Sequence, residues 1–60
     1  MELNEAYSLS QIAADGMTEK KARDLGTRIF IKDNKVYFFE YLNNQSLRLY
    51  SVINKKSFFL

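Results

Sequence analysis

The stretch Lys35-Val36-Tyr37-Phe38-Phe39-Glu40-Tyr41 decides the fold of this 60-residue chain. It is rich in β-branched and aromatic residues and contains no glycine, which is typical of a β-strand. Residues 28–32 and 47–52 have the same character. Asp33-Asn34 separates the first two of these segments in sequence, and both residue types tolerate the positive φ of a two-residue hairpin turn. The pattern therefore predicts a three-stranded antiparallel β-meander over residues 27–53.

Side chains alternate between the two faces of a strand, so the turn lengths decide which residues share a face. A two-residue first turn pairs Ile31 with Val36, and a two- or four-residue second turn adds Leu47 and Leu49 to their face. A three-residue second turn would swap the faces of the third strand. The aliphatic face, which we assign to the helices, holds Ile29, Ile31, Val36, Phe38, Leu47 and Leu49. The opposite, open face holds Phe30, Tyr37, Phe39, Tyr41 and Tyr50 with Arg28, Lys32, Lys35 and Arg48.

The N-terminal half of the chain has helical periodicity. Ser8 is a good N-cap for a helix over Leu9–Ala14, since its hydroxyl can accept a hydrogen bond from a free N–H of the first turn. Gly16 can take the left-handed conformation that ends such a helix. Thr18 predicts the start of a second helix that extends to Leu25.

These elements predict an α+β fold in which two short N-terminal helices pack on a three-stranded antiparallel β-meander. Residues 54–60 form either a short fourth strand or an extended C-terminal arm. The whole chain, residues 1–60, is expected to be one domain, with residues 8–26 helical and 27–53 in the meander. A domain of this length buries only about 60% of its unfolded surface, so we expect marginal stability.

The composition excludes most catalytic and metal-binding chemistry. The chain contains neither histidine nor cysteine, so it lacks the usual bases, thiol nucleophiles and soft metal ligands. We therefore expect no enzymatic activity, no cofactor and no small-molecule substrate. No apolar run approaches the ~18 residues of a membrane span, and the acidic start is unlike a signal peptide. A cytoplasmic protein that does not contact membranes is the expectation.

Charge is distributed unevenly along the chain. Residues 1–16 contain Glu2, Glu5 and Asp15 and no basic residue, which gives −3. The remaining residues contain all nine lysines and arginines against four acidic residues, which gives +5 and a net charge of +2 for the whole chain. Such a segment is suited to an anionic partner, although basic side chains also keep an aromatic-rich domain soluble.

The order helix, glycine turn, helix, hairpin resembles the winged helix-turn-helix family, including small excisionase-like DNA-binding proteins. The matching residues are Ile12 and Ala13, Gly16, Thr18, Ala22 and Leu25, and the predicted wing tip at residues 32–35. The resemblance implies that Lys20, Lys21 and Arg23 enter a major groove and that Lys32 and Lys35 contact phosphates. A pair of helices packed on a sheet without DNA-binding function is the alternative.

The aromatic and basic sheet face suggests a second mode of binding. Rings interleaved with cations can stack on single-stranded nucleic acid, and the same residue types dominate protein interfaces. The face could also be buried by the tail or by a second copy in a homodimer.

Two hypotheses follow. The first is a small non-enzymatic regulatory protein that binds DNA, with contacts from Lys20, Lys21, Arg23, Arg28, Lys32 and Lys35. The alternative is a modulator or inhibitor of a host protein, of the kind that mobile elements encode. Its interface would comprise Phe30, Tyr37, Phe39, Tyr41, Arg48 and Tyr50.

Overall fold

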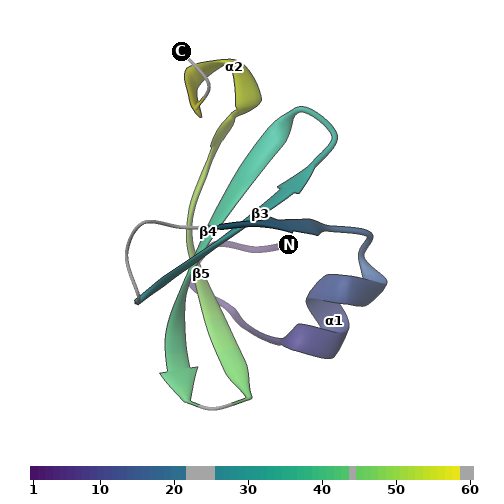
Figure 1. Ribbon diagram of the computed structural model, residues 1–60. Coiled ribbons are helices and arrows are strands. Elements are labelled where there is room, and N and C mark those ends of the chain that lie inside the picture. Colours follow the sequence, from purple (N-terminus) through teal and green to yellow (C-terminus); the bar gives the residue numbers. More distant parts are fainter. Residues whose placement is uncertain (22–25, 44, 59–60) are drawn as a thin grey trace.

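The computed structural model describes residues 1–21, 26–43 and 45–58 of the chain. These residues form an antiparallel sheet of five strands in the order β1-β5-β4-β3-β2 (Figure 1). The strands are β1 (Ala6–Ser8), β2 (Thr18–Lys20), β3 (Thr27–Lys32), β4 (Lys35–Asn43) and β5 (Ser46–Asn54). Helix α1 (Leu9–Ala14) connects the two outer strands, β1 and β2, and the single turn α2 (Lys55–Phe58) follows β5.

The predicted fold, two helices on a three-stranded meander, is wrong, because the protein is mainly β. Thr18–Lys20 does not begin a second helix but pairs with Ile29–Ile31 as an outer strand. The rest of that predicted helix, residues 22–25, lies outside the described residues. A helix of two turns has little stability of its own, whereas a strand in this place satisfies the backbone groups along the edge of β3.

The C-terminal tail also differs from both predicted forms. Strand β5 continues to Asn54, and Lys55–Phe58 then form a helical turn instead of a fourth strand or an extended arm. The backbone N–H of Lys55 donates to the carbonyl oxygen of Asn34 at an N–O distance of 2.7 Å. This bond fastens the start of α2 to the turn between β3 and β4.

Two local predictions are confirmed. The turn between β3 and β4 has two residues, with Asp33 at φ 56°, and it pairs Ile31 with Val36 and Ile29 with Phe38. Helix α1 begins after Ser8, whose hydroxyl accepts from the backbone N–H of Gln11 while the Gln11 side chain accepts from the Ser8 N–H. Gly16 follows the helix at φ 81°, a conformation that costs glycine little.

The assignment of faces in the sheet is wrong, because the pairing of β4 with β5 is irregular. The register shifts between Phe38 and Phe39, so Ser51 lies opposite Phe38 while Leu49 lies opposite Phe39. Such a bulge places an extra residue in one strand and moves the following side chains to the other face. Leu47 and Leu49 therefore join Phe39 and leave the face of Ile29 and Val36.

The main core lies on the face that was expected to be open. Phe39 is fully buried and meets Phe30 edge to face, with 5.4 Å between ring centroids. Ile12 of α1 and Met17 cover this face, and Leu47 and Leu49 complete the cluster. Aromatic rings remove more apolar surface from water than aliphatic side chains do, which favours their burial under the helix.

The opposite face of the sheet is partly buried as well. Val36 is fully buried and Ile29 nearly so. Phe38 on this face contacts the ring of Phe58 from α2, with centroids 5.8 Å apart. The sheet is thus covered by α1 on one face and by α2 at one end of the other.

We predict that Phe39→Ala unfolds the protein. Truncation of a fully buried phenylalanine costs about 3–5 kcal/mol, and a chain of this length has a total stability of only about 3–9 kcal/mol. Leu42→Ala is the control, because Leu42 is half exposed and its truncation should change the stability by less than about 1 kcal/mol. Urea denaturation followed by circular dichroism measures both. Equal stability of the two variants would contradict the position of Phe39 in the core.

Candidate nucleic-acid interface

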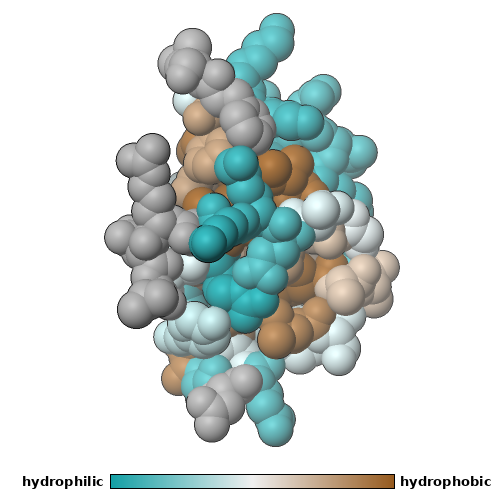
Figure 2. All heavy atoms as spheres, in the orientation of Figure 1, coloured by the Kyte–Doolittle hydropathy of each residue, from teal (hydrophilic) through white to brown (hydrophobic). Residues whose placement is uncertain are grey.

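Three segments of the chain meet at one end of the sheet. The β3–β4 turn lies beside the end of β5, since Lys35 pairs with Asn54 and Asn34 accepts the bond from the Lys55 N–H. We call this region the basic end; its lysines are Lys32, Lys35, Lys55 and Lys56. In Figure 2 hydrophilic side chains project at the upper right, where Figure 1 shows the β3–β4 turn.

The basic end retains a positive charge after its carboxylates are counted. The Lys32 ammonium lies 3.3 Å from Oδ1 of Asp15, which follows α1. Among the described residues Asp33 in the turn is the other carboxylate, so four lysines and two aspartates leave +2. The basic end therefore has a local positive charge that favours an anion.

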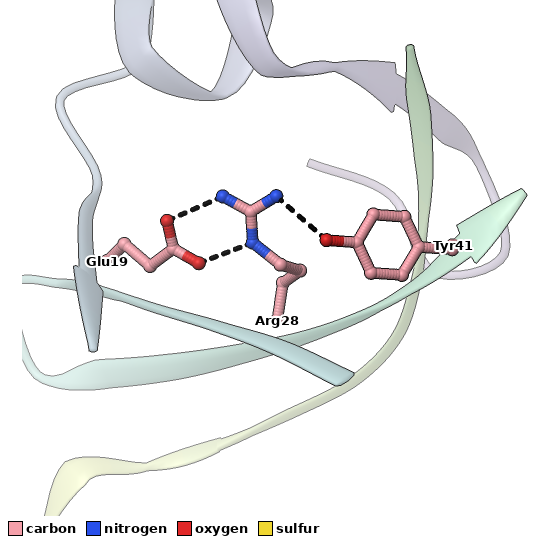
Figure 3. A network of polar contacts seen from close by, with 3 residues as sticks. All are labelled: Glu19, Arg28 and Tyr41. Carbon is pink, nitrogen blue, oxygen red and sulfur yellow. Dashed lines mark hydrogen bonds and ion pairs between the residues drawn. The ribbon is translucent and has the colours of Figure 1, made fainter. Parts of the chain in front are cut away.

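Arg28 is held in a network on the core side of the sheet (Figure 3). Its Nη2 donates to Oε1 of Glu19 at 2.6 Å, its Nε donates to Oε2, and its Nη1 donates to the Tyr41 hydroxyl at 3.2 Å. The guanidinium carbon also lies 5.7 Å from the centroid of the Phe30 ring. The network connects β2, β3 and β4 above the core.

The hydrogen bond between Arg28 and Glu19 has the largest effect on the pKa of both side chains. The hydrogen bond from Arg28 lowers the pKa of Glu19 below its usual value, although burial acts in the opposite direction. The same bond raises the pKa of Arg28, with smaller contributions from Tyr41. A bidentate arginine–carboxylate pair fixes both side chains in one geometry. Arg28 therefore fastens the outer strand β2 to the sheet.

Arg48 has a similar role on the other face. Its Nε donates to Oε1 of Glu40 at 2.8 Å, and its Nη1 donates to the side-chain oxygen of Asn4 at 2.6 Å. The contact joins β5 to β4 and to the N-terminal segment. Arg28 and Arg48, predicted for a nucleic-acid site and a protein interface respectively, both have structural partners.

The predicted DNA-contacting residues are only partly brought together. Lys32 and Lys35 lie at the basic end, as the two residues that flank the β3–β4 turn. Lys20 is on the outer strand β2, and Lys21 follows it. Arg23 lies outside the described residues. The winged helix-turn-helix arrangement is wrong, because strand β2 stands where the recognition helix would begin and the described helices have six and four residues.

The predicted aromatic surface is divided. Phe30 and Phe39 are in the core, and Tyr37 packs against it. Tyr41 and Tyr50 are 49% and 40% exposed, but Tyr41 contacts Arg28 above the core whereas Tyr50 lies beside Phe38 on the other face. No continuous stacking surface results from these five rings.

Lys55 and Lys56 are the site residues that sequence reasoning missed. The adjacent lysines were visible in the tail, but the tail was expected to be a fourth strand or an extended arm. Pairing of Lys35 with Asn54, a contact between distant parts of the chain, places the tail beside the hairpin turn.

Comparisons with protein-family models, with curated proteins and with solved structures find no match to this chain. Among residues 1–21, 26–43 and 45–58, no three His, Cys, Asp or Glu side chains are placed to share a metal ion. Within the same residues, no helix has the length and hydrophobicity needed to cross a membrane.

We predict that the Glu19–Arg28 pair makes stability depend on pH. Because the folded-state pKa of Glu19 is lowered, its contribution is present above the unfolded-state pKa and is lost as the pH falls through the folded-state value. Wild type should exceed Glu19→Gln in unfolding free energy by about 1 kcal/mol or less at neutral pH, since the pair is partly exposed. Urea titrations from neutral to acidic pH measure this difference. A difference that is constant with pH would contradict the ion pair.

Proposed function

We propose that this protein is a small binding protein that contacts the phosphate backbone of a nucleic acid through its basic end. The supporting observation is the convergence of Lys32, Lys35, Lys55 and Lys56 from separate segments. The alternative explanation of the same charge, solubility, does not require lysines to gather at one end. The two arginines with described contacts are occupied by Glu19 and Glu40, which leaves lysines as the cations of this surface.

The residue types favour contacts to phosphates over recognition of bases. A lysine ammonium is a compact, flexible point charge, whereas specific readout of guanine uses the planar fork of arginine. Four lysines can neutralise a small number of phosphates, so the predicted binding is weak, independent of sequence and sensitive to salt. This mode needs no recognition helix.

The shape of the basic end agrees with contact to a backbone. The β3–β4 turn lies at one end of the sheet, with α2 beside it (Figure 1). The Lys55–Asn34 backbone bond fixes α2 to the hairpin turn. Lysines on the two segments therefore keep a constant spacing, which lowers the entropy that binding must overcome.

We predict that binding to duplex DNA falls steeply with salt. With about four phosphates contacted, the affinity should fall by roughly 100-fold between 50 and 200 mM salt, because about 0.9 counterions are released per contact. Fluorescence anisotropy of a labelled duplex of arbitrary sequence measures this slope. Absence of binding to both DNA and RNA at low salt would refute the proposed function. A pulldown from lysate that survives nuclease treatment would then favour the protein-modulator alternative.

Lysine substitutions locate the contact. Lys35→Gln with Lys56→Gln should reduce the slope of log affinity against log salt by about two. The matched control is Lys20→Gln with Lys21→Gln, which removes the same charge from the β2 region and should alter the slope less. An equal effect of the two pairs would mean that net charge alone, and not the basic end, drives the interaction.

A further inference from the structure

Strand β5 has a strand partner along only part of its outer edge. β1 pairs with Ser46–Arg48, and Asn4 and Glu5 exchange backbone bonds with Leu49. From Ser51 to Asn54, β5 pairs with β4 on its inner side, and Tyr50 lies at the register shift between the two strands. No described strand pairs with the outer side of residues 50–54. Figure 1 shows β5 continuing past this region to α2. Five residues, about 17 Å of strand, thus present an open edge.

The two edges of the sheet differ in their protection. The outer strand β2 is only three residues long, is exposed and carries Glu19 and Lys20. Charge and shortness are the usual means by which an edge avoids pairing with another chain. The open segment of β5, Tyr50-Ser51-Val52-Ile53-Asn54, has no charged residue and no proline. Its composition favours strand addition.

Helix α2 packs on one face of the sheet. Phe58 of α2 contacts Phe38 of β4, the inner neighbour of β5. The strand ends at Asn54 because α2 begins at Lys55. A partner strand can therefore pair as far as Asn54 and no further.

The two ends of the open edge are flanked by charges of opposite sign. At the Tyr50 end lies the N-terminal turn, which contains the acidic residues Glu2 and Glu5. The backbone carbonyl of Glu5 accepts a hydrogen bond from the Leu49 N–H, and the backbone carbonyl of Glu2 accepts one from the Glu5 N–H. At the Asn54 end are Lys55 and Lys56. Antiparallel pairing of two identical edges brings the acidic flank of each copy to the basic flank of the other, as a two-fold interface requires.

We propose that the protein forms a homodimer in which the open edges of two β5 strands pair antiparallel about a two-fold axis at Val52. The two sheets then form one continuous sheet of ten strands. Tyr50 of each copy lies opposite Asn54 of the other, and Ser51 lies opposite Ile53. The partner strand stops where the N-terminal turn already occupies the outer side of Leu49, which sets the register.

Charge substitutions on the open edge test the register. Tyr50→Lys with Asn54→Lys places like charges opposite each other twice, which should weaken dimerisation by about ten-fold. Tyr50→Glu with Asn54→Lys is the matched control, because it removes the same side chains but places opposite charges together and should retain the dimer. Analytical ultracentrifugation over a concentration series measures the dissociation constants, and circular dichroism confirms folding of each variant. A wild-type protein that stays monomeric, or a dimer that persists equally in the Lys/Lys variant, would overturn the proposal.

Cysteine substitution tests the edge directly, because the chain has no cysteine of its own. In the proposed register, Tyr50→Cys with Asn54→Cys brings each new thiol opposite its counterpart in the other copy, within reach of a disulfide. Mild oxidation should give a covalent dimer on a non-reducing gel. Thr18→Cys with Lys20→Cys on β2 is the control and should remain largely monomeric. Cross-linking through β2 as fast as through β5 would overturn the proposal. The cysteine substitutions leave the lysines of the basic end unchanged, so failure of the cross-linked dimer and failure of nucleic-acid binding are separate results.

Discussion

The register shift in the pairing of β4 with β5, between Phe38 and Phe39, is the constraint on which the rest of the structure depends. It places Leu49 opposite Phe39 and so brings the leucines of β5 onto the same face as the aromatic rings of β3 and β4. With Ile12 of α1 above them, these side chains make a core that a 60-residue chain can bury. A regular ladder would send the leucines to the other face and leave Phe39 without aliphatic neighbours.

The polar contacts follow from this core. Arg28 and Arg48 each join neighbouring strands through a carboxylate, one on each face of the sheet. Exposed ion pairs of this kind contribute little stability, but they fix the positions of the short outer strand and the N-terminal segment. The two described arginines are engaged in this way, and the basic end, where the hairpin, β5 and α2 meet, is formed by lysines.

Sequence reasoning succeeded where structure is set by neighbouring residues. The Asp33-Asn34 turn and the Ser8 cap of α1 depend on interactions within a few residues, and both formed as expected. It failed for Thr18–Lys20 and for the tail, whose conformations depend on a distant strand edge or on the Asn34 carbonyl. Of the candidate site, Lys32 and Lys35 were identifiable because they flank a predictable turn, whereas Lys55 and Lys56 were not.

The sequence by itself determined the three longer strand segments, the first turn, the first helix and the surplus of lysines after residue 16. These features arise from side-chain type, from local backbone preference and from charge, none of which needs long-range contact. Only the tertiary structure decided which face of the sheet is buried, because the two register shifts between β4 and β5 change which side chains of these strands share a face. It also decided which lysines lie together and which length of β5 remains unpaired, because strand pairing across the whole chain sets both.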